Sequence, residues 1–139
     1  MPRTRVETRA RSRVLQALYA WDVRGGTPLD RVASLIWDDL AVPAEERRIA
    51  GPLVRTVIQH GEELDEQLAE VTTNWRLERL SVIDRSVLRM AAAELYRGET
   101  PPRVVIQEAV HLAERYGTPR SASFVNGVLD ALARRMGRM

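Results

Sequence analysis

The segment FVNGVLD, residues 124–130, decides between two kinds of structure, because it places an Asn-Gly pair inside an apolar run. Asn-Gly favours the tight turn of a β-hairpin. The apolar residues around the pair do not alternate as strand residues do, but recur at steps of three and four, the period of one helix face. They are Phe124, Val125, Val128, Leu129 and Leu132. The segment therefore predicts a helix, although glycine inside a helix costs about 1 kcal/mol relative to alanine.

The composition of the chain is that of a globular protein. Of its 139 residues, 45% are hydrophobic and 29% are charged, which is unlike a disordered chain. No stretch approaches the roughly 18 apolar residues of a membrane span. The N-terminus is rich in arginine and has no apolar core, so we do not expect a secretory signal. The absence of cysteine excludes disulfides and thiolate sites, and we expect a cytoplasmic location.

Charge is distributed unevenly along the chain. Residues 1–24 carry six arginines against Glu7 and Asp22, and residues 134–139 carry three arginines and no acid. The intervening residues 25–133 carry twelve arginines against seventeen acids. A basic end on an acidic body suggests an anionic ligand at that end.

The periodicity of the rest of the chain predicts an all-α protein. Glycine, proline and capping residues divide it into about seven helices, with no convincing strand and no internal repeat. The expected helices are residues 4–24, 28–40, 44–60, 62–73, 82–97, 102–116 and 121–136. Asn74-Trp75 marks the expected seam between two packed subdomains, residues 1–73 and 74–139. Short connections predict a compact helical bundle.

The first helix has one apolar face and one basic face. On a helical wheel, Arg5, Arg9 and Arg13 lie on the polar side, with Gln16 beside them and Tyr19 at its edge. Guanidinium groups bind phosphate bidentately, and an adjacent aromatic ring or amide can contact an unpaired base. The alternative is a solvated charged face with Tyr19 half-buried.

We find no pattern of an active site. His60 and His111 are the only histidines and do not have the spacing of a metal-binding motif, so we expect no metal and no cofactor. No nucleophile elbow or glycine-rich phosphate loop is present. We therefore expect a protein that is not an enzyme.

Four segments resemble the NusB family of transcription antitermination factors, and the resemblance covers nearly the whole chain. They are ARSRVLQALYAWD (10–22), WRLERLSVIDRSVLRMAAAEL (75–95), PPRVVIQEAVHLAERYG (101–117) and SFVNGVLDAL (123–132). The last is the most specific, because an apolar helix interrupted by Asn-Gly at that position is uncommon. Gln107 departs from the family pattern, where asparagine is expected.

The resemblance implies a function and a set of partners. Family members bind the single-stranded boxA element of ribosomal RNA leader transcripts together with the small-subunit ribosomal protein NusE. That complex joins the elongating RNA polymerase and helps it to pass terminators. On this basis the expected RNA contacts are Arg3, Arg5, Arg9, Arg11, Arg13, Gln16, Tyr19, Arg120 and Phe124. Core packing is the alternative role for Phe124.

The resemblance also suggests where a partner docks and what the Asn-Gly pair does. NusE is basic, so Glu78, Asp84 and Arg89 are candidates for its docking site, unless they form ion pairs within the bundle. We expect Gly127 to lie where two helices cross closely, Asn126 to bridge to a neighbouring backbone, and Asp130 to pair with an arginine. Direct contact between Asn126 and RNA is the alternative.

Two other functional classes stay open. A similar helical domain precedes ribosomal RNA cytosine methyltransferases, although this chain would then have to be a fragment. A structural homodimer could bury an apolar face that includes Leu15 and Tyr19. If the first helix instead binds RNA, replacing Arg9 and Arg13 by alanine should weaken binding with little effect on folding.

Overall fold

Six α-helices and one short 3-10 helix make up the part of the chain described by the computed structural model, residues 5–72 and 76–139. The prediction of an all-α bundle is confirmed, and no strand occurs in these ranges. The elements are α1 (Arg5–Arg24), α2 (Leu29–Asp39), α3 (Ala44–Val71), η1 (Leu77–Arg79), α4 (Val82–Arg97), α5 (Pro102–Tyr116) and α6 (Ser121–Arg135).

The expected count of about seven helices is one too high, because the helices expected at residues 44–60 and from residue 62 onward are one helix, α3 (Ala44–Val71). Helix α3 continues through Gly61, although a glycine at this position in the sequence predicts a helix end. Val57, Leu64 and Leu68 are buried on one side of it. Burying a continuous apolar stripe of this length outweighs the roughly 1 kcal/mol that one glycine costs a helix.

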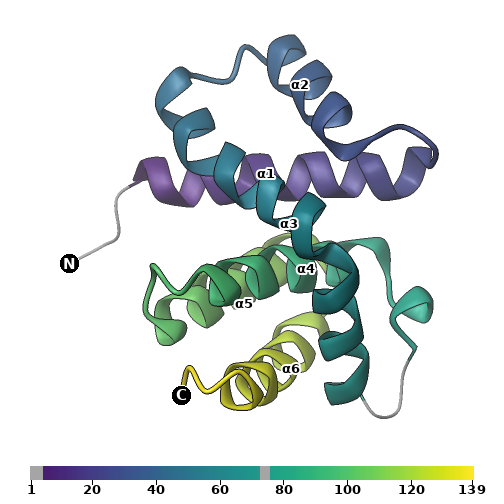
Figure 1. The fold of residues 1–139 in the computed structure, drawn as a ribbon, viewed down its shortest axis with the longest axis vertical. Coiled ribbons are helices and arrows are strands. Elements are labelled where there is room, and N and C mark those ends of the chain that lie inside the picture. Colours follow the sequence, from purple (N-terminus) through teal and green to yellow (C-terminus); the bar gives the residue numbers. More distant parts are fainter. Residues whose placement is uncertain (1–4, 73–75) are drawn as a thin grey trace.

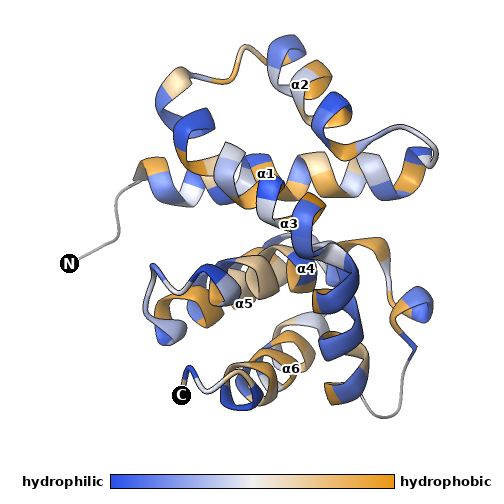
Figure 2. Cartoon of the chain, viewed as in Figure 1, coloured by the Kyte–Doolittle hydropathy of each residue, from blue (hydrophilic) through white to orange (hydrophobic). Residues whose placement is uncertain are grey.

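Helix α3 connects the two parts of the bundle. In Figure 1 it crosses α1 near α2 and then continues beside α4 and α6. One core of buried apolar side chains includes members from all six α-helices, among them Leu18, Leu68, Leu88 and Leu129. Apolar and hydrophilic residues alternate along the helices in Figure 2, as expected for helices with one buried side. The seam expected at Asn74-Trp75 lies outside the described residues, so the division into two subdomains stays a prediction.

The ends of α4 follow the sequence signals. Ser81 and Asp84 have the spacing of a capping box, and Ser81 Oγ accepts a hydrogen bond from the backbone N–H of Asp84. Gly98 ends the helix in the left-handed region at φ 69°, where glycine carries no Cβ penalty. None of the helices in the described ranges is long and apolar enough to cross a bilayer.

Gly127 does not lie at a helix crossing, and this expectation is corrected. Both Gly127 and Asn126 are exposed on α6, and a Cβ built at Gly127 would meet nothing within 4 Å beyond its chain neighbours and the backbone of its own helix. Asn126 forms no bridge to a neighbouring backbone in the described part of the chain. Asp130 does pair with an arginine, since Arg134 Nε donates to it at 3.0 Å. The packing of the bundle therefore gives no reason for the Asn-Gly pair.

Candidate nucleic-acid interface

Helix α1 presents its apolar face to the core, as its sequence predicts. Val14 and Leu18 are almost fully buried, whereas Gln16 is exposed and Tyr19 is 43% exposed. Arg5 is the first residue of α1, and Arg3 lies outside the described residues. The exposed amide and phenol are therefore available to a ligand on this face.

Arg9 and Arg13 are bound by a single carboxylate from α3. Arg9 Nε donates to Glu46 Oε2 at 2.8 Å, and Arg13 Nε donates to Glu46 Oε1 at 2.9 Å. Glu46 is only 2% exposed. The Arg9 side chain stays 47% exposed and the Arg13 side chain 24% exposed. Glu46 thus holds both guanidinium groups in place at the surface, and its buried negative charge balances part of their positive charge.

The environment of Glu46 favours its charged form. Burial acts to raise the pKa of this carboxyl, but the hydrogen bonds and positive charges of Arg13 and Arg9 outweigh burial and lower it. Glu46 therefore remains a charged anchor for the two arginines at neutral pH. Sequence reasoning missed this residue because Glu45 and Glu46 both look like ordinary acids in the first turn of a helix.

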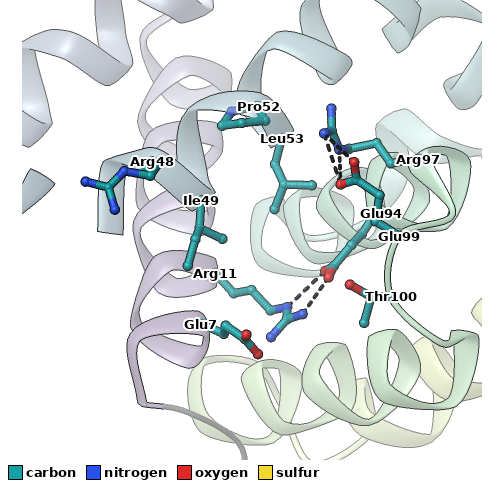
Figure 3. Close-up of a pocket in the computed structure, with 10 residues that line it drawn as sticks. All are labelled: Glu7, Arg11, Arg48, Ile49, Pro52, Leu53, Glu94, Arg97, Glu99 and Thr100. Carbon is teal, nitrogen blue, oxygen red and sulfur yellow. Dashed lines mark hydrogen bonds and ion pairs between the residues drawn. The ribbon is translucent and has the colours of Figure 1, made fainter. Parts of the chain in front are cut away.

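Arg11 does not lie on the exposed face of α1, which corrects its expected place among the RNA contacts. It is 5% exposed, and its guanidinium donates to Glu94 at 2.9 Å and to Glu108 at 3.0 Å. In Figure 3 the Arg11 side chain points at Glu94, at the edge of a cavity of about 270 Å³ between α1, α3 and the end of α4. The residue joins α1 to α4 and α5 instead of facing a ligand.

The two carboxylates keep Arg11 charged inside the protein. Burial acts to lower the pKa of Arg11, but the hydrogen bond to Glu94 and the charges of Glu94 and Glu108 raise it. The sequence did contain a signal for this cluster. Arg11 lies four residues before Leu15 on the apolar side of α1, and Glu94 lies within the apolar run of α4.

The other predicted RNA contacts lie at the start of α6. Arg120 is exposed immediately before the helix, and Phe124 is half-buried against the core. Thr8 of α1 and Asn126 of α6 line one groove together with residues of α5. The first turns of α1 and the middle of α6 therefore border the same groove, with α5 between them.

The three residues expected at the partner site have different surroundings. Glu78 is exposed and lies 3.9 Å from Arg76. Asp84 is half-buried in the first turn of α4, and its Oδ1 has no hydrogen-bond partner within the described residues. Arg89 is not available, because its guanidinium binds Asp65 and Asp22. For Arg89 the alternative of an ion pair within the bundle is the correct one.

The acidic partners of Arg89 belong to a groove that also includes Glu78. This groove has a volume of about 460 Å³ and lies between the end of α1, the second half of α3, η1 and α4. Four acids line it against two arginines: Asp22, Asp65, Glu66 and Glu78 against Arg85 and Arg89. The groove thus has an acidic excess on the part of the surface formed by α3 and η1. Within the described residues, no group of three histidine or acidic side chains has a metal-binding arrangement.

Comparison with known proteins places the chain beside one family. The NusB family model matches residues 8–134. The transcription antitermination protein NusB of Anaeromyxobacter dehalogenans is 47% identical over 127 residues, which are 91% of this chain and 89% of that protein. The NusB protein of Sorangium cellulosum is 42% identical over 130 residues, 93% of this chain and 92% of that protein.

Solved structures agree with the sequence comparison. A T. maritima NusB structure has a TM-score of 0.86 at 33% identity, covering 96% of this chain and 93% of that one. A crystal structure of the antitermination factors NusB and NusE in complex with double-stranded RNA also has a TM-score of 0.86. It is 27% identical and covers 96% of this chain and 99% of that chain.

Proposed function

This chain belongs to the NusB family, and on that premise we propose that it is an RNA-binding transcription antitermination factor. It binds the boxA-type element of ribosomal RNA leader transcripts together with ribosomal protein NusE, and the complex associates with elongating RNA polymerase. The observation that carries the proposal is the match over 96% of the chain to a NusB protein solved with NusE and RNA. Such a factor acts in the cytoplasm and is an adaptor without catalytic activity.

The surface of α1 supplies the RNA contacts in this proposal. Glu46 holds Arg9 and Arg13 through their Nε atoms. One outer nitrogen of Arg9 lies 3.7 Å from Glu45 and one of Arg13 lies 3.4 Å from Gln16, so a phosphate oxygen replaces these long contacts or binds the second outer nitrogen. Tyr19 offers an exposed ring on which an unpaired base can stack, and Gln16 offers an amide beside Arg13. Arg120 and Phe124 extend this surface at the start of α6. Arg11 is left out because both of its carboxylate partners are internal.

The acidic groove that includes Glu78 is the proposed docking site for NusE. A basic partner gains from an acidic surface mainly through faster association and correct orientation. Glu78 is the most accessible of the three candidates, with its side chain 74% exposed.

The two other functional classes have less support. The homodimer was expected to bury Leu15, but Leu15 is 4% exposed and already packed inside one chain. The relatives and structures named above are antitermination proteins, and 89% or more of each one's length is matched by this chain. They therefore favour the antitermination role over that of a methyltransferase domain.

A transcription assay tests the proposed function directly. The template carries a ribosomal RNA leader with boxA upstream of a terminator, and the cell extract is depleted of the protein. Adding the protein back with NusE should raise the fraction of transcripts that pass the terminator. A template with a scrambled boxA should show no such increase. An increase that is equal on both templates, or absent from both, would contradict the proposal.

A further inference from the structure

The exposed Asn-Gly pair of α6 has no role in the packing of the bundle. Gly127 lies in the middle of a 15-residue helix, and the space where its Cβ would be is open. Alanine at this position would favour the helix without meeting another atom of the chain. A glycine that the interior does not need is explained if something outside the chain approaches the helix backbone closely.

A polar groove lies against this pair. It has a volume of about 620 Å³, within the range typical of ligand-binding sites. Three helices form it: α1 through Thr8, α5 through most of its lining, and α6 through Asn126. Its side chains are Thr8, Gln107, Glu108, Val110, His111, Glu114 and Asn126.

One wall of the groove is fixed by the buried cluster of Arg11. Thr8 Oγ1 donates to Glu108 Oε1 at 3.0 Å, and the same oxygen accepts from Arg11 at 3.0 Å. These bonds hold α1 against α5. By contrast, the exposed lining residues are Gln107, His111, Glu114 and Asn126. The groove therefore has a rigid base and accessible polar groups at its rim.

The chemistry of the lining fits a nucleobase better than a phosphate. Among the residues that the structure describes, no arginine lines the groove, and the charge of Glu114 would repel a phosphate. An asparagine amide has both a donor and an acceptor, as the edge of a base requires, and a carboxylate accepts from exocyclic amino groups. An imidazole ring can stack on a base that has left its helix.

We propose that the groove between α1, α5 and α6 receives one unstacked base of the bound RNA. Asn126 reads the edge of that base, and Gly127 allows the attached sugar to approach α6. This inference rests on the proposed function, since it requires that the protein binds RNA. It separates two tasks on one surface: the arginines of α1 bind the RNA backbone, and the groove selects sequence.

Two single substitutions test the proposal in the full-length protein. Asn126→Ala should weaken binding of a boxA-like strand roughly tenfold, because it removes a base contact. Its effect on a scrambled strand should be much smaller, whereas loss of a phosphate contact would weaken both strands equally. Gly127→Ala should raise the melting temperature by about 3 °C and yet lower affinity for the boxA-like strand.

Gly61→Ala is the matched control for the glycine substitution. Gly61 also lies inside a helix, and a Cβ there would make only an ordinary contact with Val57 at 3.9 Å. This control should raise the melting temperature without changing RNA affinity, since Gly61 lies on α3, which contributes no residue to the groove, whereas Gly127 adjoins the lining residue Asn126.

The possible outcomes separate the groove from the function. If the unmodified protein binds the boxA-like strand but both α6 variants bind it equally well, the groove proposal is wrong and the proposed function stands. If the variants lose binding to NusE in the absence of RNA, the groove is a protein-binding site and the proposal is again wrong. If the unmodified protein binds neither strand, with or without NusE, the proposed function itself fails.

Discussion

The Nε atom of Arg13 donates a 2.9 Å hydrogen bond to Glu46, a carboxylate that is almost completely buried. Arg9 binds the other oxygen of the same carboxylate at 2.8 Å. The two arginines that carry the basic face of α1 therefore also stabilise the contact between α1 and α3. The sequence alone predicts that their removal has little effect on folding, whereas this contact predicts a loss of stability.

Replacing Arg9 and Arg13 together by alanine should lower the free energy of unfolding by about 2 kcal/mol. The reason is that Glu46 would remain buried without a partner. Urea denaturation followed by circular dichroism measures the change. Arg48→Ala is a suitable control, because this exposed arginine has no ion pair within the described residues and should change stability by less than about 0.5 kcal/mol.

A third substitution checks the cause of that loss. Adding Glu46→Leu to the double variant removes the unpaired carboxylate and should recover most of the lost stability. A double variant that unfolds at the same urea concentration as the unmodified protein would show that Glu46 does not depend on the two arginines.

The lowered pKa of Glu46 should make the protein less stable in acid. In the folded state the pKa of Glu46 lies below its ordinary value of 4.5. At a pH between these two pKa values, the unfolded state therefore binds more protons than the folded state. The stabilisation is complete above about pH 4.5 and is lost as pH falls through the lower, folded-state pKa. The stability advantage over Glu46→Gln should therefore shrink as pH falls below 4.5 in urea titrations. An advantage that is constant between pH 7 and pH 3 would contradict this account.

Arg11→Met should destabilise the protein more than any exposed arginine substitution, by about 3 kcal/mol. It leaves Glu94 and Glu108 buried without their shared cation. Thermal unfolding followed by calorimetry measures the effect. Adding Glu94→Gln and Glu108→Gln should restore part of the melting temperature, and a single variant as stable as the unmodified protein would rule out the cluster as a stabilising contact.

Glu78→Arg should weaken binding of NusE without changing stability, because Glu78 is exposed and its only ion pair with another described residue is the 3.9 Å contact with Arg76. Isothermal titration calorimetry at low salt should show a loss of several-fold in affinity. Asp39→Arg, an exposed acid at the end of α2, serves as the matched charge reversal. Equal losses in both variants would indicate an effect of net charge and not a docking site on η1.

The sequence was sufficient for the helices, because their signals are local. The periodicity of α5, the capping box at Ser81 and the glycine after Arg97 all depend on neighbours within a few residues. Phe124 resembles a family aromatic, but only the structure shows that its side chain is half-buried against the core. The continuity of α3 across Gly61 was missed, since it depends on what the helix packs against.

The charged contacts of α1 could not be predicted in the same way. Arg9 and Glu46 are 37 residues apart, and Arg11 and Glu94 are 83 residues apart. No local pattern reports that two helices meet at those positions. The Asn-Gly pair shows a related limit. The sequence reveals that Gly127 disfavours its helix, but it does not show which surface of the protein requires a glycine there.

The salt dependence of RNA affinity tests the central claim most directly. Fluorescence anisotropy with a boxA-like strand and a scrambled strand, with and without NusE, gives the affinity at each salt concentration. We predict preference for the boxA-like strand, tighter binding with NusE, and a slope of log affinity against log salt that reflects about 0.7 ions released per phosphate contacted. Equal binding of both strands, or no binding with NusE present, would contradict the account and return the arginines of α1 to a purely structural role.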